Sequence, residues 1–168
     1  MNSAMVMSLR SGRPIANLLG PIINPNNLFI EAWYVKDSQS GQQLILLSKD
    51  IREVMGRGFI VDDHDVLSEE SDLIRLKNII KLEFPLLGLK VTSESKKNYG
   101  KVVDYAFETE SFIIKKIYSG QPLIRSISGG NLSIDRTQII EITNRRIIIE
   151  DPTIKSDDKS LATAPANT

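Results

Sequence analysis

The residues of this chain that are best suited to chemistry lie together in one short segment, "VDDHDV" at 61–66. It places Asp62, Asp63 and Asp65 beside His64, the only histidine in the 168-residue sequence. Carboxylate oxygens are typical ligands of calcium, magnesium or manganese, so the segment is a candidate cation site. A single histidine excludes the multi-histidine zinc sites. Because the segment follows a predicted closing strand and its later counterpart is only "EDPT", we interpret it as a solvated turn and predict no metal.

Nucleophilic catalysis is not supported by the residue pattern. A catalytic nucleophile needs a base beside it, and that base needs a group that orients it. His64 is the only imidazole, the chain has no cysteine, and no serine lies in a Gly-x-Ser-x-Gly elbow. We therefore predict that the protein is not an enzyme and uses no cofactor.

The composition places the chain among ordinary globular proteins. Hydrophobic residues make up 41% and charged residues 25% of the sequence, which is enough to bury a core. The 21 basic and 21 acidic residues cancel, so no net field gathers nucleic acid or anionic membrane. No stretch approaches the ~18 apolar residues of a membrane span, and the start lacks a signal-peptide pattern. We expect a soluble, cytoplasmic protein without membrane insertion.

The elements that must position these residues occur twice along the chain. The first copy reads "SGRPIAN", "LFIEAWYV" and "KDIREVMGRGFIVDD", and the second reads "LLGLKVT", "FIIKKIYS" and "TQIIEITNRRIIIED". The comparison pairs six positions: Gly12 with Gly88, Leu28 with Phe112, Tyr34 with Tyr118, Ile51 with Ile139, Glu53 with Glu141, and Asp63 with Asp151. Similarity in a fixed order predicts an internal duplication.

Both copies share an irregularity in their central strand. Apolar residues recur with nearly the same spacing, at Leu28, Ile30, Trp33 and Val35 in the first copy and at Phe112, Ile114 and Ile117 in the second. Ile30 and Trp33 in the first copy, and Ile114 and Ile117 in the second, are separated by one residue more than strict alternation allows. Such an extra residue is typical of a β-bulge, which bends a strand. Short bent strands favour a small barrel over a flat sheet. We predict an all-β protein of two small barrels, each with its own core.

The segment between the copies, "SEESDLIRLKNIIKLEFP", predicts one short amphipathic α-helix. Its first turn is acidic, which suits the helix dipole, and Leu73, Leu76 and Ile80 follow helical spacing. Pro85 then ends the helix. The predicted organisation is a first unit at 1–66, a linker helix at 67–84, a second unit at 85–152 and a disordered tail at 153–168.

Both copies resemble the PRC-barrel, a small all-β barrel. The resemblance lies in the glycine-led first strand ("GRPI", "GLKV"), the "YGKVVDY" strand at 99–105, the bulged strand and the closing strand ("GFIVDD", "RIIIED"). In the first copy "LGPIINP" stands in place of "YGKVVDY", with Gly20 opposite Gly100. Family members of known role are mostly binders, and they include the cytoplasmic part of a photosynthetic reaction-centre protein, the ribosome maturation factor and some archaeal cell-division adaptors. The resemblance implies two tandem PRC-barrels that act as a binding module.

Four large side chains form the candidate interface. With the bulge in place, Phe29, Tyr34, Ile113 and Tyr118 should point away from the cores, and clustered outward apolar residues often mark contact surfaces. They are covered either by the linker, by the other unit, or by an outside protein, which includes a second copy in a homodimer. The leading hypothesis is a non-enzymatic adaptor or scaffold for a protein partner of unknown identity.

Basic residues of the second copy support an alternative. Seven of them are candidates for contact with phosphates: Lys96, Lys97, Lys101, Lys115, Lys116, Arg145 and Arg146. If some share one face, they could hold a nucleic-acid backbone; otherwise they form an ordinary solvated face. The alternative function is a ribosome- or RNA-associated maturation factor that acts through the basic face of the second barrel.

Overall fold

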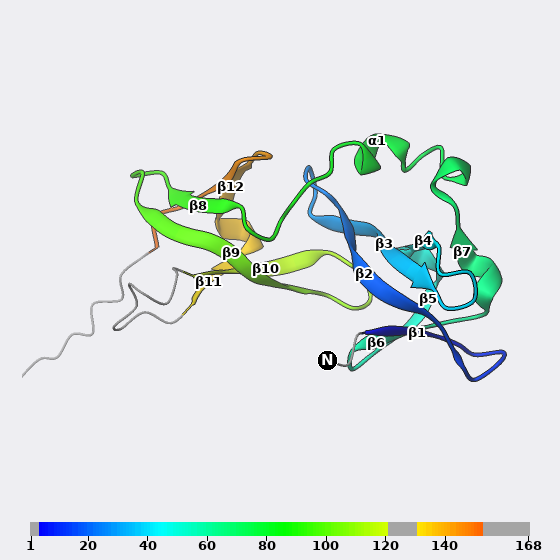
Figure 1. The fold of residues 1–168 in the computed structure, drawn as a ribbon. Coiled ribbons are helices and arrows are strands. Elements are labelled where there is room, and N and C mark those ends of the chain that lie inside the picture. Colours follow the sequence, from blue (N-terminus) through cyan, green and yellow to red (C-terminus); the bar gives the residue numbers. More distant parts are fainter. Residues whose placement is uncertain (1–3, 121–130, 153–168) are drawn as a thin grey trace, which may run out of the picture.

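The computed structural model describes residues 4–120 and 131–152, which form two β-sheets side by side (Figure 1). The first sheet contains β1 (Met5–Ser8), β2 (Pro14–Asn24), β3 (Phe29–Asp37), β4 (Gln43–Leu47), β5 (Ile51–Met55), β6 (Gly58–Val61) and β7 (Leu67–Ser68). The second contains β8 (Lys90–Ser93), β9 (Asn98–Phe107), β10 (Ile114–Gly120), β11 (Leu132–Asp135), β12 (Ile139–Ile142) and β13 (Arg146–Ile149). The predicted β class is confirmed, and the tail predicted at 153–168 lies outside the described residues.

The two sheets have the same strand order. The first runs β5-β6-β1-β2-β3-β4-β7, and the second runs β12-β13-β8-β9-β10-β11. Neighbouring strands are antiparallel, except that β1 pairs parallel with β6 and β8 pairs parallel with β13. The duplication is therefore confirmed at the level of topology. Among the described residues neither hydrogen-bonded order returns to its first strand, so the structure shows two sheets rather than closed barrels.

The central strands repeat in register as well. In the first sheet Trp33 lies opposite Pro21, and in the second its counterpart Ile117 lies opposite Tyr105. The β2–β3 pairing shifts register between Leu18 and Gly20 and again between Ile22 and Ile23. The β9–β10 pairing shifts at the two equivalent places. The predicted bulge is thus confirmed in both copies, and Trp33 and Ile117 are both buried.

The first strand of the duplication is not where the sequence comparison places it. That comparison pairs Gly12 with Gly88, but Gly12 lies in the turn after β1, with a φ of 65°. Its structural counterpart is Lys96, in the turn after β8, with a φ of 64°. Each donates its backbone N–H to the last residue of the preceding strand, Ser8 or Ser93. The equivalence of Gly12 and Gly88 is wrong because two different turns each need a residue with positive φ.

This correction also changes the second strand. "GRPI" begins β2, and the first strand of that copy is "MVMS". Gly20 lies opposite Tyr34, as Asp104 lies opposite Tyr118. Gly20 therefore corresponds to Asp104 and not to Gly100.

A symmetric pair of hydrogen bonds joins the two sheets. The N–H of Ile30 donates to the carbonyl of Phe112, and the N–H of Ile114 donates to the carbonyl of Leu28, both at 2.9 Å. Between them Phe29 and Ile113 form an antiparallel bridge. Leu28 and Phe112 have nearly equal positive φ angles, 56° and 54°. Equivalent residues thus contact each other reciprocally, as across a local two-fold axis.

The hydrophobic core is continuous across this junction, which corrects the expectation of two separate cores. One cluster of buried residues extends from Val6 to Ile149 and includes both sheets. At its centre lie four aromatic rings, Trp33 and Phe59 from the first unit and Phe107 and Phe112 from the second. Their centroid distances are 4.8 Å for Trp33–Phe59, 5.7 Å for Trp33–Phe107 and 6.4 Å for Phe59–Phe112.

The linker is less helical than its pattern predicted. Residues 67–68 form β7 on the edge of the first sheet, Glu70–Asp72 is a 3₁₀ turn, and α1 spans only Lys77–Ile80. No side chain caps α1. A short α-helix without a cap is marginal, and here the segment is held by its packing against the outer face of the first sheet. Buried Leu76 and Ile80 contact the sheet residues Ile22, Ala32 and Ile45 there.

Gly88, which precedes β8, should not tolerate a side chain. Its φ is +88°, and a Cβ placed on it meets no atom within 4 Å. Replacement by alanine should therefore cost about 1–2 kcal/mol of unfolding free energy from backbone strain alone. The matched control is Gly20→Ala, which also meets open space but at a φ outside the left-handed range, and it should be neutral or slightly stabilising. Urea titrations of both variants measure the difference, and equal effects would contradict the prediction.

Candidate functional site

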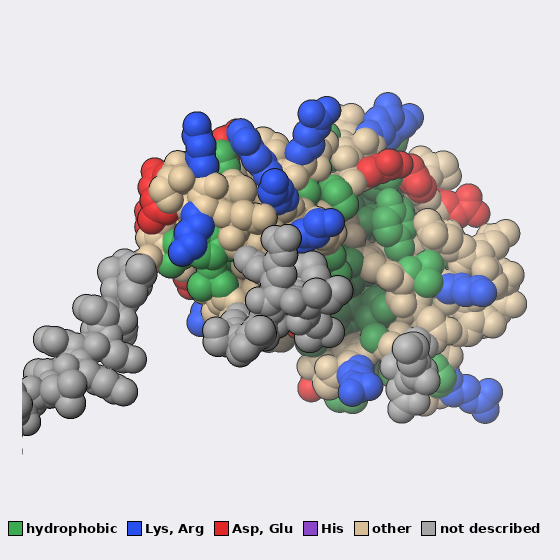
Figure 2. Space-filling view, turned by 60° about the vertical axis from the view of Figure 1, so that its left-hand side comes forward, with side chains coloured by type: hydrophobic (Ala, Val, Ile, Leu, Met, Phe, Trp, Pro, Cys, Tyr) green, Lys and Arg blue, Asp and Glu red, His purple; other side chains and the backbone are tan. Residues whose placement is uncertain are grey.

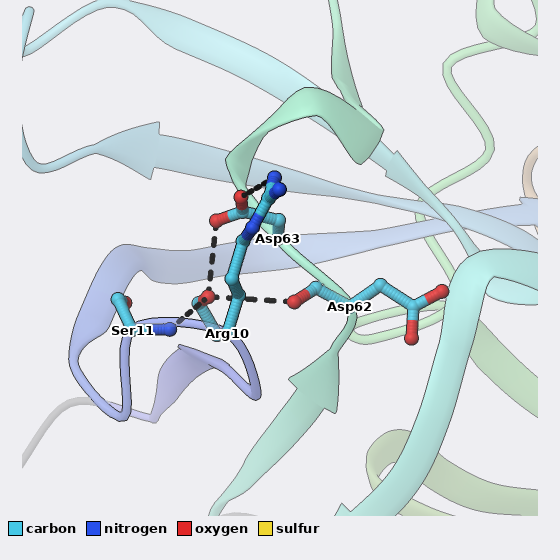
Figure 3. A network of polar contacts seen from close by, with 5 residues as sticks. Arg10, Ser11, Asp62 and Asp63 are labelled. Atoms are coloured by element: carbon cyan, nitrogen blue, oxygen red, sulfur yellow. Dashed lines mark hydrogen bonds and ion pairs between the residues drawn. The ribbon is translucent and has the colours of Figure 1, made fainter.

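The first two acids of the predicted turn point to different partners. Asp63 accepts a hydrogen bond from the Ser8 hydroxyl at 3.1 Å and pairs with Arg10 at 3.1 Å (Figure 3). The Ser8 hydroxyl oxygen in turn accepts the backbone N–H of Ser11. The carboxylate of Asp62 turns away and binds the guanidinium of Arg52 through two bonds of 2.8 Å. These contacts fasten the end of β6 to β5 and to the β1–β2 turn.

His64 points in a third direction. Its Nε2 lies 2.7 Å from the Oδ1 of Asp37, a carboxylate that is only 3% exposed at the end of β3. The other oxygen of Asp37 accepts the backbone N–H and the hydroxyl of Ser40. Hydrogen bonds from Ser40, followed by that of His64, hold the pKa of Asp37 well below its usual range. Asp37 is thus a buried anion whose hydrogen bonds favour the charged form.

Asp62, Asp63 and His64 are each bonded to a different neighbouring element of the first unit. The pKa of Asp63 is lowered chiefly by the backbone N–H of His64 and then by Arg10 and Ser8, and that of Asp62 by Arg52. Within residues 4–120 and 131–152, no three acidic or histidine side chains form a group that could hold a cation. In the same part of the chain the ring of His64 bonds to a carboxylate and not to a hydroxyl nucleophile.

The second copy repeats the arrangement. Asp151, predicted as the equivalent of Asp63, accepts a hydrogen bond from Ser95, which is itself bonded to Ser93. Hydrogen bonds from Ser93 and then Ser95 lower the pKa of Asp151. Ser93 and Ser8 occupy the same place at the end of the first strand in each copy. In each copy a serine–aspartate hydrogen bond thus joins the first strand, or the turn that follows it, to the end of the closing strand.

No protein-family model matches the chain, and no curated protein matches it. No helix of the described residues is long and apolar enough to cross a membrane.

The structure places the predicted interface residues in two different environments. Phe29 and Ile113 form the bridge between the sheets. Tyr34 packs against the linker cluster on the outer face of the first sheet, and burial, together with the charges of Glu70 and Glu83, raises its pKa. Tyr118 is half-buried at the same position of the second sheet. Two of the open alternatives are therefore realised within the chain, the linker for Tyr34 and the other unit for Phe29 and Ile113.

A groove that the sequence did not reveal lies between the first sheet and the linker. It has a volume of about 580 Å³ and more apolar than polar lining. Its apolar walls are Phe29, Leu47, Leu73, Ile74, Leu76 and Ile79, and its charged residues are Glu31, Lys49, Asp72 and Arg75. Ile74 is open to solvent, with 81% of the residue exposed. The helical pattern could not predict this exposure because the linker does not continue as a helix there.

The seven basic candidates lie in several environments. Lys115 pairs with Glu108 at 3.5 Å, Lys116 lies opposite Asp135, and Lys97 lies over the ring of Tyr99 at 5.4 Å. Lys96 and Arg145 lie in turns. Lys101 and Arg146 instead flank Lys90, which the sequence did not single out. Their juxtaposition depends on a parallel pairing between β13 and β8, which no local pattern predicts.

Proposed function

We propose that the protein is a non-enzymatic scaffold in which two tandem PRC-barrel units present a binding groove to a segment of a partner protein. The duplicated six-strand order supports the barrel relationship, because the short bent strands and shared bulges suit a closed barrel. The acidic segment supports a structural role, since Asp62 and Asp63 are both used to fasten strands.

The groove between the linker and the first sheet is the observation that carries the proposal. An apolar floor surrounded by charged residues is the usual anatomy of a protein interface. Ile74 is a large apolar side chain, 81% exposed at this place, which is costly unless something covers it. Charges of both signs at the rim, Glu31 and Lys49 among them, fit a polypeptide with mixed charge better than a uniformly charged ligand.

Ile74→Asp is the variant that tests the groove. A photo-cross-linking residue at Ile74 should capture a partner in native cells, and the partner identified in this way is then titrated by calorimetry. Ile74→Asp should weaken its binding by about 10- to 30-fold, as expected when an interface anchor is lost. Because Ile74 is exposed, the melting temperature should stay unchanged.

The matched control is Ile140→Asp, at an apolar residue of β12 that is 49% exposed on the second sheet. It should bind the partner like the unmodified chain. If Ile140→Asp weakened binding as much as Ile74→Asp, the groove would not be the binding site.

A further inference from the structure

Three cations stand side by side on the outer face of the second sheet. Arg146 on β13 lies directly opposite Lys90 on β8, and Lys90 lies directly opposite Lys101 on β9. All three residues are exposed. We call them the cationic row. Since neighbouring strands are about 4.8 Å apart, the row places the backbones of three cationic residues within about 10 Å.

No acid lies directly opposite a cation of the row, although two exposed acids, Glu141 and Asp104, lie one position along on the same face of the described sheet. The next residues on the same face, Ile148 and Thr92, are uncharged and lie opposite each other. Glu141 on β12 lies opposite Ile148 rather than opposite Arg146, and Asp104 on β9 is opposite Tyr118. Within the described part of the chain, the ion pairs involve none of the three cations. Like charges directly opposite on a sheet destabilise it, so the row is a cost to the fold.

The first unit provides an internal comparison, because the same strands occupy the same places there. The counterparts of the three cations are Gly58 on β6, Met5 on β1 and Asn17 on β2, as the equivalent pairings show. This row is uncharged. The positive charges are therefore not required by the strand order, which both sheets share, and they belong to one copy only.

Figure 2 shows several Lys and Arg side chains over the half of the molecule that holds the second sheet, and others over the first half. The row presents its cations in a line across three strands. A nucleic-acid strand carries one phosphate for about every 3.4 Å of helix axis, so about three phosphates span the length of the row. From this match we propose that the cationic row binds the phosphate backbone of a nucleic acid, independently of the groove.

The test measures binding to labelled oligonucleotides by fluorescence anisotropy at several salt concentrations. The probes are a 20-nucleotide single-stranded RNA of mixed sequence and a DNA duplex of equal length. Three phosphate contacts predict that affinity falls by roughly 20- to 40-fold between 50 and 200 mM salt, with a log–log slope of about −2 to −3. Whichever probe binds with this slope identifies the form of nucleic acid.

The variant K90Q/K101Q/R146Q should lose most of this binding and reduce the slope towards zero. The control K36Q/R57Q/K81Q removes the same number of positive charges from exposed positions elsewhere, and K90R/K101R/R146K retains the row. Both should bind like the unmodified chain. Circular dichroism checks that each variant is folded. K90Q/K101Q/R146Q should be at least as stable as the parent chain, because it removes the repulsion between like charges on neighbouring strands.

Several results would overturn the assignment. The unmodified chain could fail to bind either probe at 50 mM salt, or the control could lose as much affinity as the row variant. Binding to vesicles that contain phosphatidylserine, without binding to either oligonucleotide, would assign the row to a membrane surface instead of a nucleic acid. Loss of the groove's partner in Ile74→Asp leaves these measurements unaffected, so the two proposals succeed or fail separately.

Discussion

Phe112→Ala should destabilise the whole protein by about 3–5 kcal/mol and unfold both units together. Phe112 is 7% exposed, so its removal leaves a cavity that the surrounding core cannot fill. Its ring stacks on Phe107 at 5.7 Å and meets Phe59 of the first unit at 6.4 Å. Because the core is continuous across the junction, the lost packing destabilises both sheets.

The single tryptophan makes this prediction easy to read. Trp33 lies in the first unit and its ring contacts Phe107 of the second at 5.7 Å, so its fluorescence reports on the first unit and on the junction. Urea curves recorded by fluorescence and by far-ultraviolet circular dichroism should shift to lower urea by the same amount. Leu87→Ala, at a residue 53% exposed, is the control and should stay within about 0.5 kcal/mol of the parent. Two separate unfolding transitions in either signal would show independent units.

Asp37→Ala should cost about 2–3 kcal/mol at neutral pH, because hydrogen bonds to a charged group are among the stronger ones in proteins. The carboxylate is 3% exposed, and its removal leaves Ser40 and His64 without their shared acceptor. Asp65→Ala is the control, since Asp65 is an exposed acid of the same region and should have little effect. Urea denaturation at pH 7 measures both variants.

The contribution of Asp37 to the free energy of unfolding should depend on pH in a definite direction. The pKa of Asp37 is lower in the folded chain than in the unfolded chain, so the unfolded state takes up the proton first as the solution is acidified. The contribution of Asp37 is therefore complete above the unfolded value of about 3.9 and is lost as the pH falls below it. The free energy of unfolding of the parent should fall between pH 5 and pH 3 more steeply than that of Asp37→Ala. Parallel curves would show that Asp37 does not titrate in this way.

The central strands could be predicted from the sequence because their pattern is local. The extra residue between Ile30 and Trp33 appears directly as a break in alternation, and both copies carry it. The equivalence of Asp63 and Asp151 also follows from closing strands of equal length. The outer strand could not be placed in the same way, because positive φ is required both at Gly12, before β2, and at Gly88, before β8.

Contacts that depend on tertiary structure could not be predicted. The linker shows helical spacing, yet its apolar residues are buried through docking on Ile22 and Ile45 rather than through a continuous helix. Asp37 and His64 lie in separate segments, and nothing local indicates that a turn acid receives the only imidazole. Lys90 belongs to the cationic row only because β13 pairs with β8.

The bridge at Phe29 and Ile113 has a consequence for assembly. Reciprocal contact between equivalent residues is the geometry of an isologous dimer. This chain therefore contains, within one polypeptide, the kind of interface that two separate protomers form by association. The covalent link makes that encounter intramolecular and independent of protein concentration. Either half expressed alone would expose the backbone groups and apolar side chains that form this junction. It should therefore associate with a second copy of itself.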